Sequence, residues 1–370
     1  MRIAKRENNT KREYLVVNRF QGKHIPVRPG KALEMFDALG ELLIQANFVE
    51  RLLVVGFAET ATAIGAAVAA GLSADYIQTT REWADGVSYL YFSEEHSHAA
   101  QQKLVKEDMD SALEWAERII FVEDEVTTGK TILNIVDILK KQYKCRLKFS
   151  VASLLNGMDE RALKTYEDLG IDLFWLVKTE HSSYTEIARS YPGDGCYLSY
   201  RNEPCFPADF LHITMENMTD ARRRVKPDVY ARFCERLWEE VMGQADFKEA
   251  KDILVLGTEE FMYPALMFGK KLEEEGKHVW FHATTRSPIA VSKKEDYPLH
   301  KRYELDSFYE KGRRTFLYDI HKYDACVVIT DAWRNVSEGM CSLAAALKLC
   351  GNEKVIFVTQ GKGQEKEGNR

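Results

Sequence analysis

The sequence predicts an α/β protein of two domains, and three observations support this. The chain has 370 residues, more than one hydrophobic core usually serves. Short apolar runs without polar alternation are followed by helical stretches, which is typical of parallel strands covered on both faces. A weak internal repeat favours a second α/β domain that arose by duplication, although two unrelated α/β domains are the alternative. Each domain is therefore expected to be a parallel sheet flanked by helices.

The first half contains three expected strands, at residues 52–57, 119–122 and 149–155. Helices are expected after the first two strands, at residues 63–70 and 131–140. Ligands of such sheets bind at the carboxyl ends of the strands, so functional residues are expected there.

The second half repeats this pattern from Ile253 onward, and three segments correspond in order. The corresponding pairs are 54–59 with 255–260, 79–81 with 284–286, and 121–124 with 328–331. The separation from Arg81 to Asp124 is 43 positions (124 − 81), and that from Arg286 to Asp331 is 45 (331 − 286). We expect domains at residues 1–205 and 206–359 and a polar, Gly-rich, disordered tail at 360–370.

The composition indicates which class of ligand the protein binds and in which cellular compartment it is expected. A net charge of -6 argues against nucleic acid as a partner and favours a small ligand. The short basic run 222–224 is expected to be a solvated stretch. The seven cysteines are scattered without a CxxC pair, so neither a zinc site nor a disulfide framework is indicated and reduced thiols are expected. No apolar run is long enough to span a bilayer, and a cytoplasmic protein without a membrane anchor is expected.

Residues 119–131 combine a buried strand, two acids and a hydroxyl-rich turn before a helix. Glu123 and Asp124 can accept hydrogen bonds from neighbouring sugar hydroxyls. The turn offers backbone amides, hydroxyls and a glycine at a helix N-terminus, which favours a phosphate. Its residues are Thr127, Thr128, Gly129, Lys130 and Thr131. A nucleoside-triphosphate P-loop would need glycine where Asp124 stands, and the remaining alternative is a charged turn whose threonine caps a helix.

With its four apolar residues, acidic pair, short spacer and Thr-Gly-Lys-Thr, this segment resembles the signature of the type I phosphoribosyltransferase family. The resemblance implies a phosphoribosyltransferase-type parallel sheet. Further segments are similar to the subgroup found in tellurium-resistance (Ter) gene clusters, in which a C-terminal TRSP domain is named for Thr-Arg-Ser-Pro. These segments are 22–27, 56–62, 79–82, 95–99 and, for the TRSP motif, 285–288.

The resemblance implies phosphoribosyl diphosphate with Mg²⁺ as donor, and departure of pyrophosphate. It places pyrophosphate in the loop after the first strand, with an arginine nearby and a flap that carries proton-transfer groups. The pyrophosphate loop corresponds to Ala58, Glu59, Thr60, Ala61 and Thr62, the arginine to Arg81, and the flap histidines to His96 and His98. Mg²⁺ would arrive through the donor, with Glu59 or Asp124 as protein ligands. The segment 23–26 is either a hood over the acceptor or ordinary N-terminal packing.

The second domain has no Thr-Gly-x-Thr turn and is not expected to bind the donor in the same way. Its strand ends nevertheless gather hydroxyls, acids and a guanidinium, which could bind an anionic ligand. The candidate residues of this second site are Thr258, Glu259, Thr285, Arg286, Ser287 and Asp331. The alternative is a domain that only completes or rigidifies the first.

Taken together, the sequence predicts a Mg²⁺-dependent phosphoribosyltransferase that acts on a nucleobase-like acceptor. Catalytic roles are expected for Glu123, Asp124, Arg81, His96 and His98. The alternative is a non-catalytic regulatory protein that binds phosphoribosyl diphosphate or a nucleotide. The identity of the base, the direction of the reaction and the choice between monomer and homodimer stay open.

Overall fold

The computed structural model describes residues 1–361 except positions 8, 10–11, 85, 93–101, 144–146, 203 and 205–209. The chain forms two compact units. Unit 1 comprises Met1–Ala32, Tyr184–Thr219 and the chain from Ala231 onward, and unit 2 comprises Leu33–Ser183 and Asp220–Tyr230. The chain crosses between the units within helix α1 (Pro29–Gln45), between Ser183 and Tyr184, between Thr219 and Asp220, and within helix α7 (Pro227–Gln244). The sequence boundary expected between residues 205 and 206 stays a prediction.

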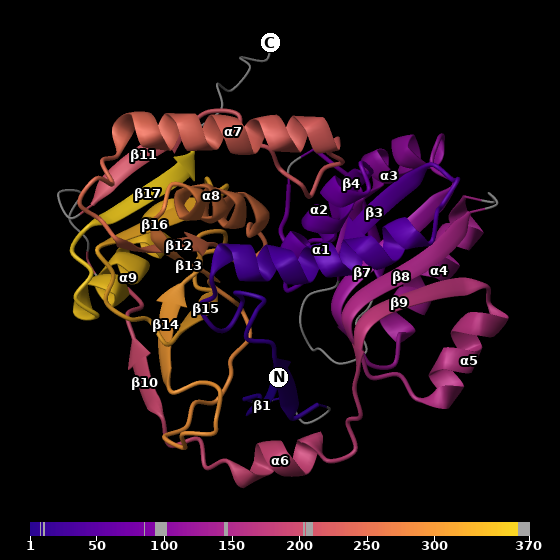
Figure 1. Cartoon of the computed structure of the whole chain (residues 1–370), viewed down its shortest axis with the longest axis horizontal. Helices are drawn as coiled ribbons and strands as arrows, with labels where there is room; N and C mark the ends of the chain where they lie inside the picture. Colours follow the sequence, from indigo (N-terminus) through magenta and orange to yellow (C-terminus); the bar gives the residue numbers. More distant parts are fainter. Residues whose placement is uncertain are drawn as a thin grey trace. The chain divides into compact units, whose positions relative to one another are not determined.

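Unit 2 contains a five-stranded sheet in the order β4-β3-β7-β8-β9, and all neighbouring strands are parallel (Figure 1). Its strands are β3 (Leu52–Gly56), β4 (Asp75–Gln78), β7 (Arg118–Val126), β8 (Lys148–Asn156) and β9 (Ile171–Lys178). The expected parallel α/β sheet is therefore confirmed. The apolar runs that predicted β3, β7 and β8 form its centre, because central parallel strands are covered on both faces.

Helices and a short hairpin accompany this sheet. The Ala-rich helix α2 contacts β3, β4 and β7, and its small side chains let it lie close to the strands. The elements are α2 (Thr62–Gly71), α3 (Lys106–Leu113), α4 (Lys130–Gln142), α5 (Glu160–Asp168) and the antiparallel strands β5 (Tyr89–Phe92) and β6 (Gln102–Val105).

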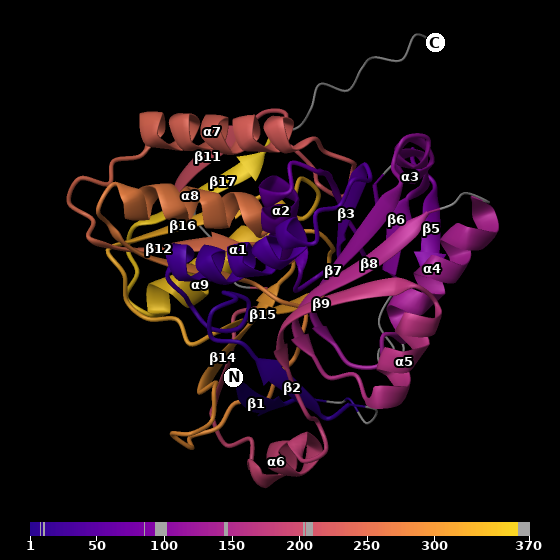
Figure 2. The same cartoon turned by 45° about the vertical axis from the view of Figure 1, so that its right-hand side comes forward.

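Unit 1 contains a second all-parallel sheet in the order β11-β17-β16-β12-β13 (Figure 2). Its strands are β11 (Leu211–Met215), β12 (Asp252–Gly257), β13 (His278–Ala283), β16 (Ala325–Thr330) and β17 (Val355–Gln360). The other elements are α6 (Tyr184–Ser190), α8 (Tyr263–Glu274), α9 (Val336–Leu349), the pair β1 (Arg2–Lys5) and β2 (Tyr14–Val17), and the three-stranded sheet of β10 (Cys196–Ser199), β14 (Lys301–Asp306) and β15 (Arg314–Tyr318). The second α/β domain is confirmed.

The two sheets share the arrangement of four of their strands. β4-β3-β7-β8 in unit 2 matches β13-β12-β16-β17 in unit 1. Gly56 of β3 lies opposite Val122 in the parallel register, and Gly257 of β12 lies opposite Ile329. The sheets differ at the fifth position, where β9 follows the other strands in the sequence and β11 precedes them. The shared order and register support the duplication.

The N-terminal segment is an integral part of unit 1. Val27 forms an antiparallel bridge with Phe281 of β13. Lys23 is fully buried, and its Nζ donates hydrogen bonds to the carbonyl oxygens of Glu259 at 2.6 Å and Thr284 at 2.9 Å. The simpler of the two interpretations of segment 23–26, N-terminal packing, is therefore confirmed.

The basic run 222–224 is only partly the solvated stretch that was expected, because Arg223 is exposed whereas Arg222 is buried and Arg224 is partly buried. Within unit 2, Arg223 Nε lies 2.5 Å from Asp108 Oδ2, and Arg224 Nη1 lies 2.6 Å from Asp75 Oδ2. Val225 pairs with Tyr76 through two backbone hydrogen bonds, which brings the arginines next to these acids. Ion pairs with neighbouring acids account for charges that the sequence alone presents as a block.

Among the cysteines that the structure describes, Cys341 differs from the expectation. Cys196, Cys234, Cys326 and Cys350 are free thiols, whereas Cys341 is disulfide-bonded. The expectation of uniformly reduced thiols is therefore wrong at Cys341. Among the described residues, no helix combines the length and hydropathy needed to cross a bilayer.

Candidate functional site

Strand β7 delivers the acidic pair to the C-terminal edge of the unit 2 sheet. Residues 119–122 are completely buried, whereas Glu123 and Asp124 are only partly buried. Asp124 Oδ1 accepts a hydrogen bond of 2.7 Å from Thr60 Oγ1 in the loop after β3. The acidic pair and the small-residue loop therefore meet at neighbouring strand ends, where carboxylate oxygens can accept hydrogen bonds from sugar hydroxyls.

The turn after β7 is shaped by Gly129. Its φ of 71° suits glycine, and an added Cβ would lie 2.4 Å from the hydroxyl oxygen of Tyr166. The Tyr166 hydroxyl donates a hydrogen bond of 2.6 Å to the Gly129 carbonyl oxygen. Burial and, secondarily, the negative charge of Glu123 raise the pKa of Tyr166, so this hydroxyl stays protonated. Tyr166 thus fixes the turn from which α4 begins at Lys130.

The first turn of α4 is suited to an anion. It contains no acidic residue, while Lys140 and Lys141 stand in the last turn. The positive end of the helix dipole therefore favours a negative group at the N-terminus. The predicted phosphate residues 127–131 form this turn and the start of the helix, and Lys130 is exposed.

The loop after β3 is held by hydrogen bonds to its backbone. The Ala58 amide donates to Thr79 Oγ1 at 2.8 Å, and Gln102 Nε2 donates to the Ala58 carbonyl oxygen. The peptide between Ala58 and Glu59 is cis. Tyr76 donates its hydroxyl proton to the carbonyl oxygen of Thr62, where α2 begins. Side chains from β4, from the residue after it and from β6 thus fix this loop beside β7.

Glu59, Ala61 and Arg81 complete the predicted pyrophosphate region. Glu59 is 7% exposed and Ala61 is fully buried. Arg81 is partly buried and follows Thr80, whose backbone pairs with Lys103 of β6. Because β4 neighbours β3, Arg81 and the loop lie at neighbouring strand ends. His96 and His98 lie outside the described residues, so their catalytic role stays a prediction.

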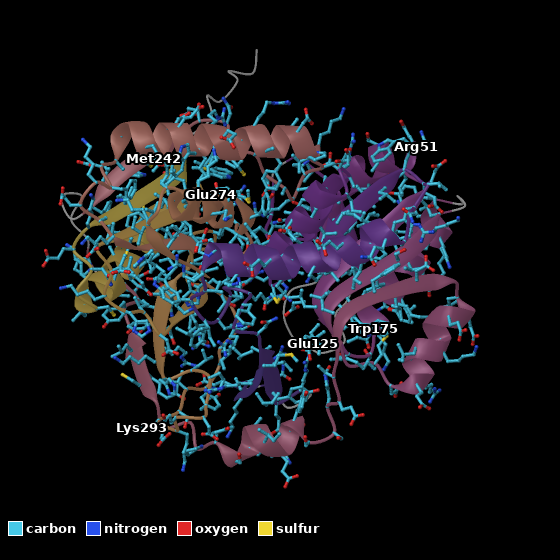
Figure 3. The ribbon with its side chains drawn as sticks, in the orientation of Figure 1. Arg51, Glu125, Trp175, Met242, Glu274 and Lys293 are labelled. Carbon is cyan, nitrogen blue, oxygen red and sulfur yellow. The ribbon has the colours of Figure 1, made fainter. Side chains whose placement is uncertain are left out.

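The structure also brings together two residues that sequence reasoning missed, Glu125 and His181. His181 Nε2 lies 3.3 Å from Glu125 Oε1 and 2.8 Å from Thr179 Oγ1. Both side chains are largely buried, and the imidazole occupies the space that a Cβ on Gly157 would take. Figure 3 labels Glu125, which follows the acidic pair on β7. The available sequence signal was a third acid after that pair and a polar segment after β9.

Gln102 and Lys103 of β6 were missed as well. Both are 2% exposed. Gln102 bonds to both Thr79 and Ala58, and Lys103 Nζ lies 3.3 Å from the ring centroid of Trp83. No sequence motif predicts these contacts, because they depend on the pairing of β6 with the segment after β4.

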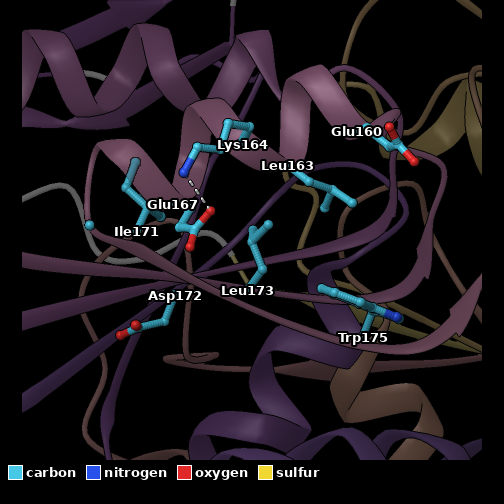
Figure 4. A pocket seen from close by; sticks show the side chains of 9 residues that line it. Glu160, Leu163, Lys164, Glu167, Ile171, Asp172, Leu173 and Trp175 are labelled. Carbon is cyan, nitrogen blue, oxygen red and sulfur yellow. Dashed lines mark hydrogen bonds and ion pairs between the residues drawn. The ribbon is translucent and has the colours of Figure 1, made fainter.

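A hollow of about 550 Å³ lies between α5 and β9, at the edge of the unit 2 sheet (Figure 4). Its wall includes Leu163, Trp175 and the ion pair between Lys164 and Glu167, whose charged atoms are 3.0 Å apart. None of the predicted site residues lines it. The hollow is therefore a feature separate from the strand-end region.

The candidate second-site residues gather at the corresponding edge of unit 1. Thr258 and Glu259 are fully buried, and Thr258 Oγ1 donates to Thr330 Oγ1 at 2.7 Å. Asp331 Oδ1 accepts a hydrogen bond of 2.6 Å from the Tyr309 hydroxyl.

The Thr-Arg-Ser-Pro segment continues this edge after β13. Thr285 pairs through its backbone with Phe316 of β15. Arg286 bonds to Glu260 at 2.9 Å, and the Ser287 carbonyl oxygen accepts from the Tyr318 hydroxyl at 2.7 Å. The predicted residues are thus brought together, largely through contacts with one another and with β14 and β15.

Comparisons with known proteins agree with this architecture. A family model described as "Phosphoribosyl transferase" (PRTase_2) matches residues 1–183, and one described as "TRSP domain C terminus to PRTase_2" matches residues 221–347. No curated protein matches.

Several solved structures show a weaker likeness. An adenine phosphoribosyltransferase from Rhodothermus marinus is 13% identical, with a TM-score of 0.34, and the match covers 48% of this chain and 93% of that one. The enzyme from Giardia lamblia, complexed with 9-deazaadenine, is 18% identical over 41% of this chain and 85% of that one, with a TM-score of 0.29. A hypoxanthine phosphoribosyltransferase from Staphylococcus aureus is 14% identical over 41% and 74%, with a TM-score of 0.26.

The family models, which match consecutive parts of the chain, carry the assignment. They confirm the predicted class of enzyme and the predicted pairing of domains. Residues 1–183 are a phosphoribosyl transferase domain of the PRTase_2 type, and residues 221–347 are the TRSP domain that follows it.

Proposed function

We propose that unit 2 transfers ribose 5-phosphate from phosphoribosyl diphosphate to a nucleobase-like acceptor and releases pyrophosphate. The observation that carries the proposal is the hydrogen bond from Thr60 to Asp124. It joins the acidic pair of β7 to the small-residue loop after β3, beside the N-terminus of α4. A sugar that carries phosphates at both ends needs these three features next to one another.

The donor is oriented by three groups of residues. The first turn of α4, residues 127–131, takes the 5-phosphate through amides and the helix dipole. Glu123 and Asp124 accept hydrogen bonds from the ribose hydroxyls. The loop 58–62 and Arg81 take the pyrophosphate, whose charge the guanidinium neutralises as the group departs.

The acceptor enters on the opposite side of the ribose from the pyrophosphate. In a single displacement the nucleophile attacks the face opposite the leaving group. The pyrophosphate region lies at the ends of β3 and β4, so the acceptor lies toward the ends of β8 and β9. Glu125 and His181 stand on that side and offer a carboxylate and an imidazole for the edge of a nitrogen heterocycle.

Mg²⁺ fits this arrangement as a companion of the donor. The described residues contain no group of three or more His, Cys, Asp or Glu side chains suited to hold a metal. Mg²⁺ commonly binds through substrate phosphates, waters and one or two carboxylates, and Asp124 or Glu59 would supply the latter. The ion would neutralise charge on the departing pyrophosphate.

The proposal is tested by incubating the whole chain with phosphoribosyl diphosphate, MgCl₂ and a panel of nucleobases while pyrophosphate release is measured. Release that requires one class of base and is lost in Asp124→Asn is the expected result. Asp168→Asn, which alters an exposed carboxylate on α5 of the same unit, is the matched control and should keep full activity. Tight donor binding without release for any base would instead favour a regulatory protein.

The cellular setting is a further part of the proposal. The resemblance of segments such as 22–27 and 285–288 to the tellurium-resistance subgroup supports a role in a stress pathway of that type, in the cytoplasm. Deletion of the gene should then increase sensitivity to tellurite, and Asp124→Asn should fail to restore resistance. Full restoration by Asp124→Asn would contradict a role for the transfer reaction there.

A further inference from the structure

The loops after β3 and β12 share a pattern of hydrogen bonds, although only the first contains a cis peptide and only the second has a positive φ at the corresponding residue. In unit 2 the Ala58 amide donates to Thr79 Oγ1 at 2.8 Å, and in unit 1 the Glu259 amide donates to Thr284 Oγ1 at 3.0 Å. The amide of Thr79 donates to the Gly56 carbonyl oxygen, and that of Thr284 to the Gly257 carbonyl oxygen. Each loop residue lies two positions after its glycine. Glu259 therefore stands where unit 2 has Ala58.

The hairpins that follow also correspond. Thr80 pairs with Lys103 of β6, and Thr285 pairs with Phe316 of β15. The connection between β14 and β15, residues 307–313, is therefore the counterpart of the connection between β5 and β6, where the flap is predicted. The described chain includes all of the unit 1 connection.

Glu259 fastens that connection to its loop. The side chain is fully buried, and the backbone has a positive φ of 47°. Ser307 Oγ donates to Glu259 Oε1 at 2.6 Å, and Arg313 Nη2 lies 3.0 Å from Glu259 Oε2. Both ends of residues 307–313 thus bond to a single carboxylate.

Two arginines contact this carboxylate, and each also pairs with a second acid, Arg313 with Glu310 and Arg286 with Glu260. Besides Arg313, Arg286 Nε lies 3.7 Å from Glu259 Oε2. Lys23 Nζ bonds to the Glu259 backbone carbonyl oxygen at 2.6 Å. Arg286 is the counterpart of Arg81, the arginine predicted to contact pyrophosphate. Two guanidiniums and a hydroxyl therefore contact the carboxylate, and groups of this kind are also suited to a phosphate.

We propose that unit 1 retains a phosphate-binding cradle whose ligand is the protein's own Glu259 carboxylate. The donors of the loop and hairpin surround this internal anion, and the flap counterpart stays closed on it. Naming the class of ligand as a diphosphate rests on the proposed function of the corresponding loop in unit 2. Unit 1 is thus closed to phosphorylated ligands, and removal of one side chain opens it.

Glu259→Gly tests the proposal, because glycine removes the carboxylate and accepts the positive φ. Inorganic pyrophosphate is titrated into the whole chain by calorimetry. Glu259→Gly should bind one more pyrophosphate per chain than the wild type does, and its melting temperature should rise more with pyrophosphate. Glu274→Ala, which removes a partly exposed glutamate of α8, is the control and should bind as the wild type does.

The gain is counted relative to the wild type, so it does not depend on unit 2. Failure of the proposed function would leave the wild type without a pyrophosphate site, while the gain of one in Glu259→Gly would persist. If folded Glu259→Gly binds no more pyrophosphate per chain than the wild type, the inference is overturned. Glu259 and Arg313 would then form an ordinary buried ion pair. If Glu259→Gly does not fold alone, recovery of its fold in millimolar pyrophosphate but not in equimolar NaCl supports the inference, and no recovery overturns it.

Discussion

The loops after β3 and β12 share a pattern of backbone hydrogen bonds and differ in the charge of one side chain. After β3 the residue at this position is the uncharged Ala58, and Thr60 donates to the partly buried Asp124 nearby. After β12, a glutamate fills the corresponding space and pairs with Arg313 and Arg286. In the account proposed above, a single side chain at one loop position distinguishes a loop that binds an external anion from one occupied by the protein's own carboxylate. The comparison teaches that the chemistry of such a fold is decided by side chains at the sheet edge, while the topology stays constant.

The largest expected effect comes from making unit 2 resemble unit 1. Ala58→Glu places a carboxylate in the predicted pyrophosphate loop. A like charge about 4 Å away costs about 4 kcal/mol at an effective dielectric constant of about 20. Donor binding, measured by calorimetry, should therefore weaken roughly a thousandfold. Ala58→Ser, which adds no charge, is the control, and equal donor affinity in both variants would contradict the comparison.

The second effect concerns the turns of the two units. Gly129 in unit 2 and Gly193 in unit 1 both have a φ of 71°. A Cβ would meet Tyr166 at 2.4 Å in the first case, but nothing closer than 3.6 Å in the second. Gly129→Ala should lose about 3 kcal/mol of unfolding free energy, from the positive φ and the clash, and Gly193→Ala only about 1 kcal/mol. Chemical denaturation measures both losses, and equal losses would exclude the clash as a cause.

The third expected effect is a difference between the two units in how their stability depends on pH. Burial, with a smaller contribution from the charge of Lys23, lowers the pKa of His282 in unit 1 to about 4. Hydrogen bonds from Lys148 and Arg118 lower the pKa of Glu50 in unit 2 to about 2. The neutral form of His282 makes its full contribution to the stability of the folded state above pH 6.5, and this contribution declines as the pH falls toward 4. The ionised form of Glu50 makes its full contribution to folded-state stability above pH 4.5, and this contribution declines as the pH falls toward 2.

Unit 1 should therefore lose about 2 kcal/mol of stability between pH 7.5 and pH 5, while the Glu50 contribution to unit 2 stays constant. Hydrogen exchange resolved by segment measures the two units in one sample. Exchange should accelerate at β12, β13 and β16 before it does at β3, β7 and β8. His282→Gln, which does not titrate, should remove the difference between the units in this pH range.

The smallest expected effect tests whether Glu125 and His181 contact the acceptor in unit 2. His181→Asn and Glu125→Gln each weaken a charge-assisted contact and should raise the KM for the acceptor about tenfold, or about 1.4 kcal/mol. The KM for phosphoribosyl diphosphate should stay within about twofold. Initial-rate kinetics with both substrates varied separate the two constants. An equal rise in both constants would indicate a structural role for the pair.

The sequence predicted the parts of this account that depend on local pattern. The apolar runs that became β3, β7, β8 and β12 were recognisable because strands buried on both faces carry little polar alternation. The correspondence of Asp124 with Asp331 came from spacing, and the strand register supports it. A helix N-terminus after an acidic strand end was equally local, since Gly129 and Lys130 mark it directly.

The parts that the sequence did not predict depend on contacts between distant positions. The Glu125 and His181 side chains are 56 positions apart (181 − 125), and they meet because β9 pairs with β8. Lys23 belongs to unit 1 although 236 positions separate it from Glu259. The basic run near residue 223 is charge-paired because the chain returns to β4. Pairings of this kind follow from tertiary packing and leave no trace in a local pattern.

The most direct test of the central claim is the number of phosphoribosyl diphosphate molecules that one chain binds in the presence of Mg²⁺. Calorimetry of the wild type, Asp124→Asn and Asp331→Asn compares the two corresponding carboxylates in one experiment. The account predicts one donor per chain for the wild type and Asp331→Asn, and none for Asp124→Asn. Two donors per chain, or loss of binding in Asp331→Asn alone, would contradict it.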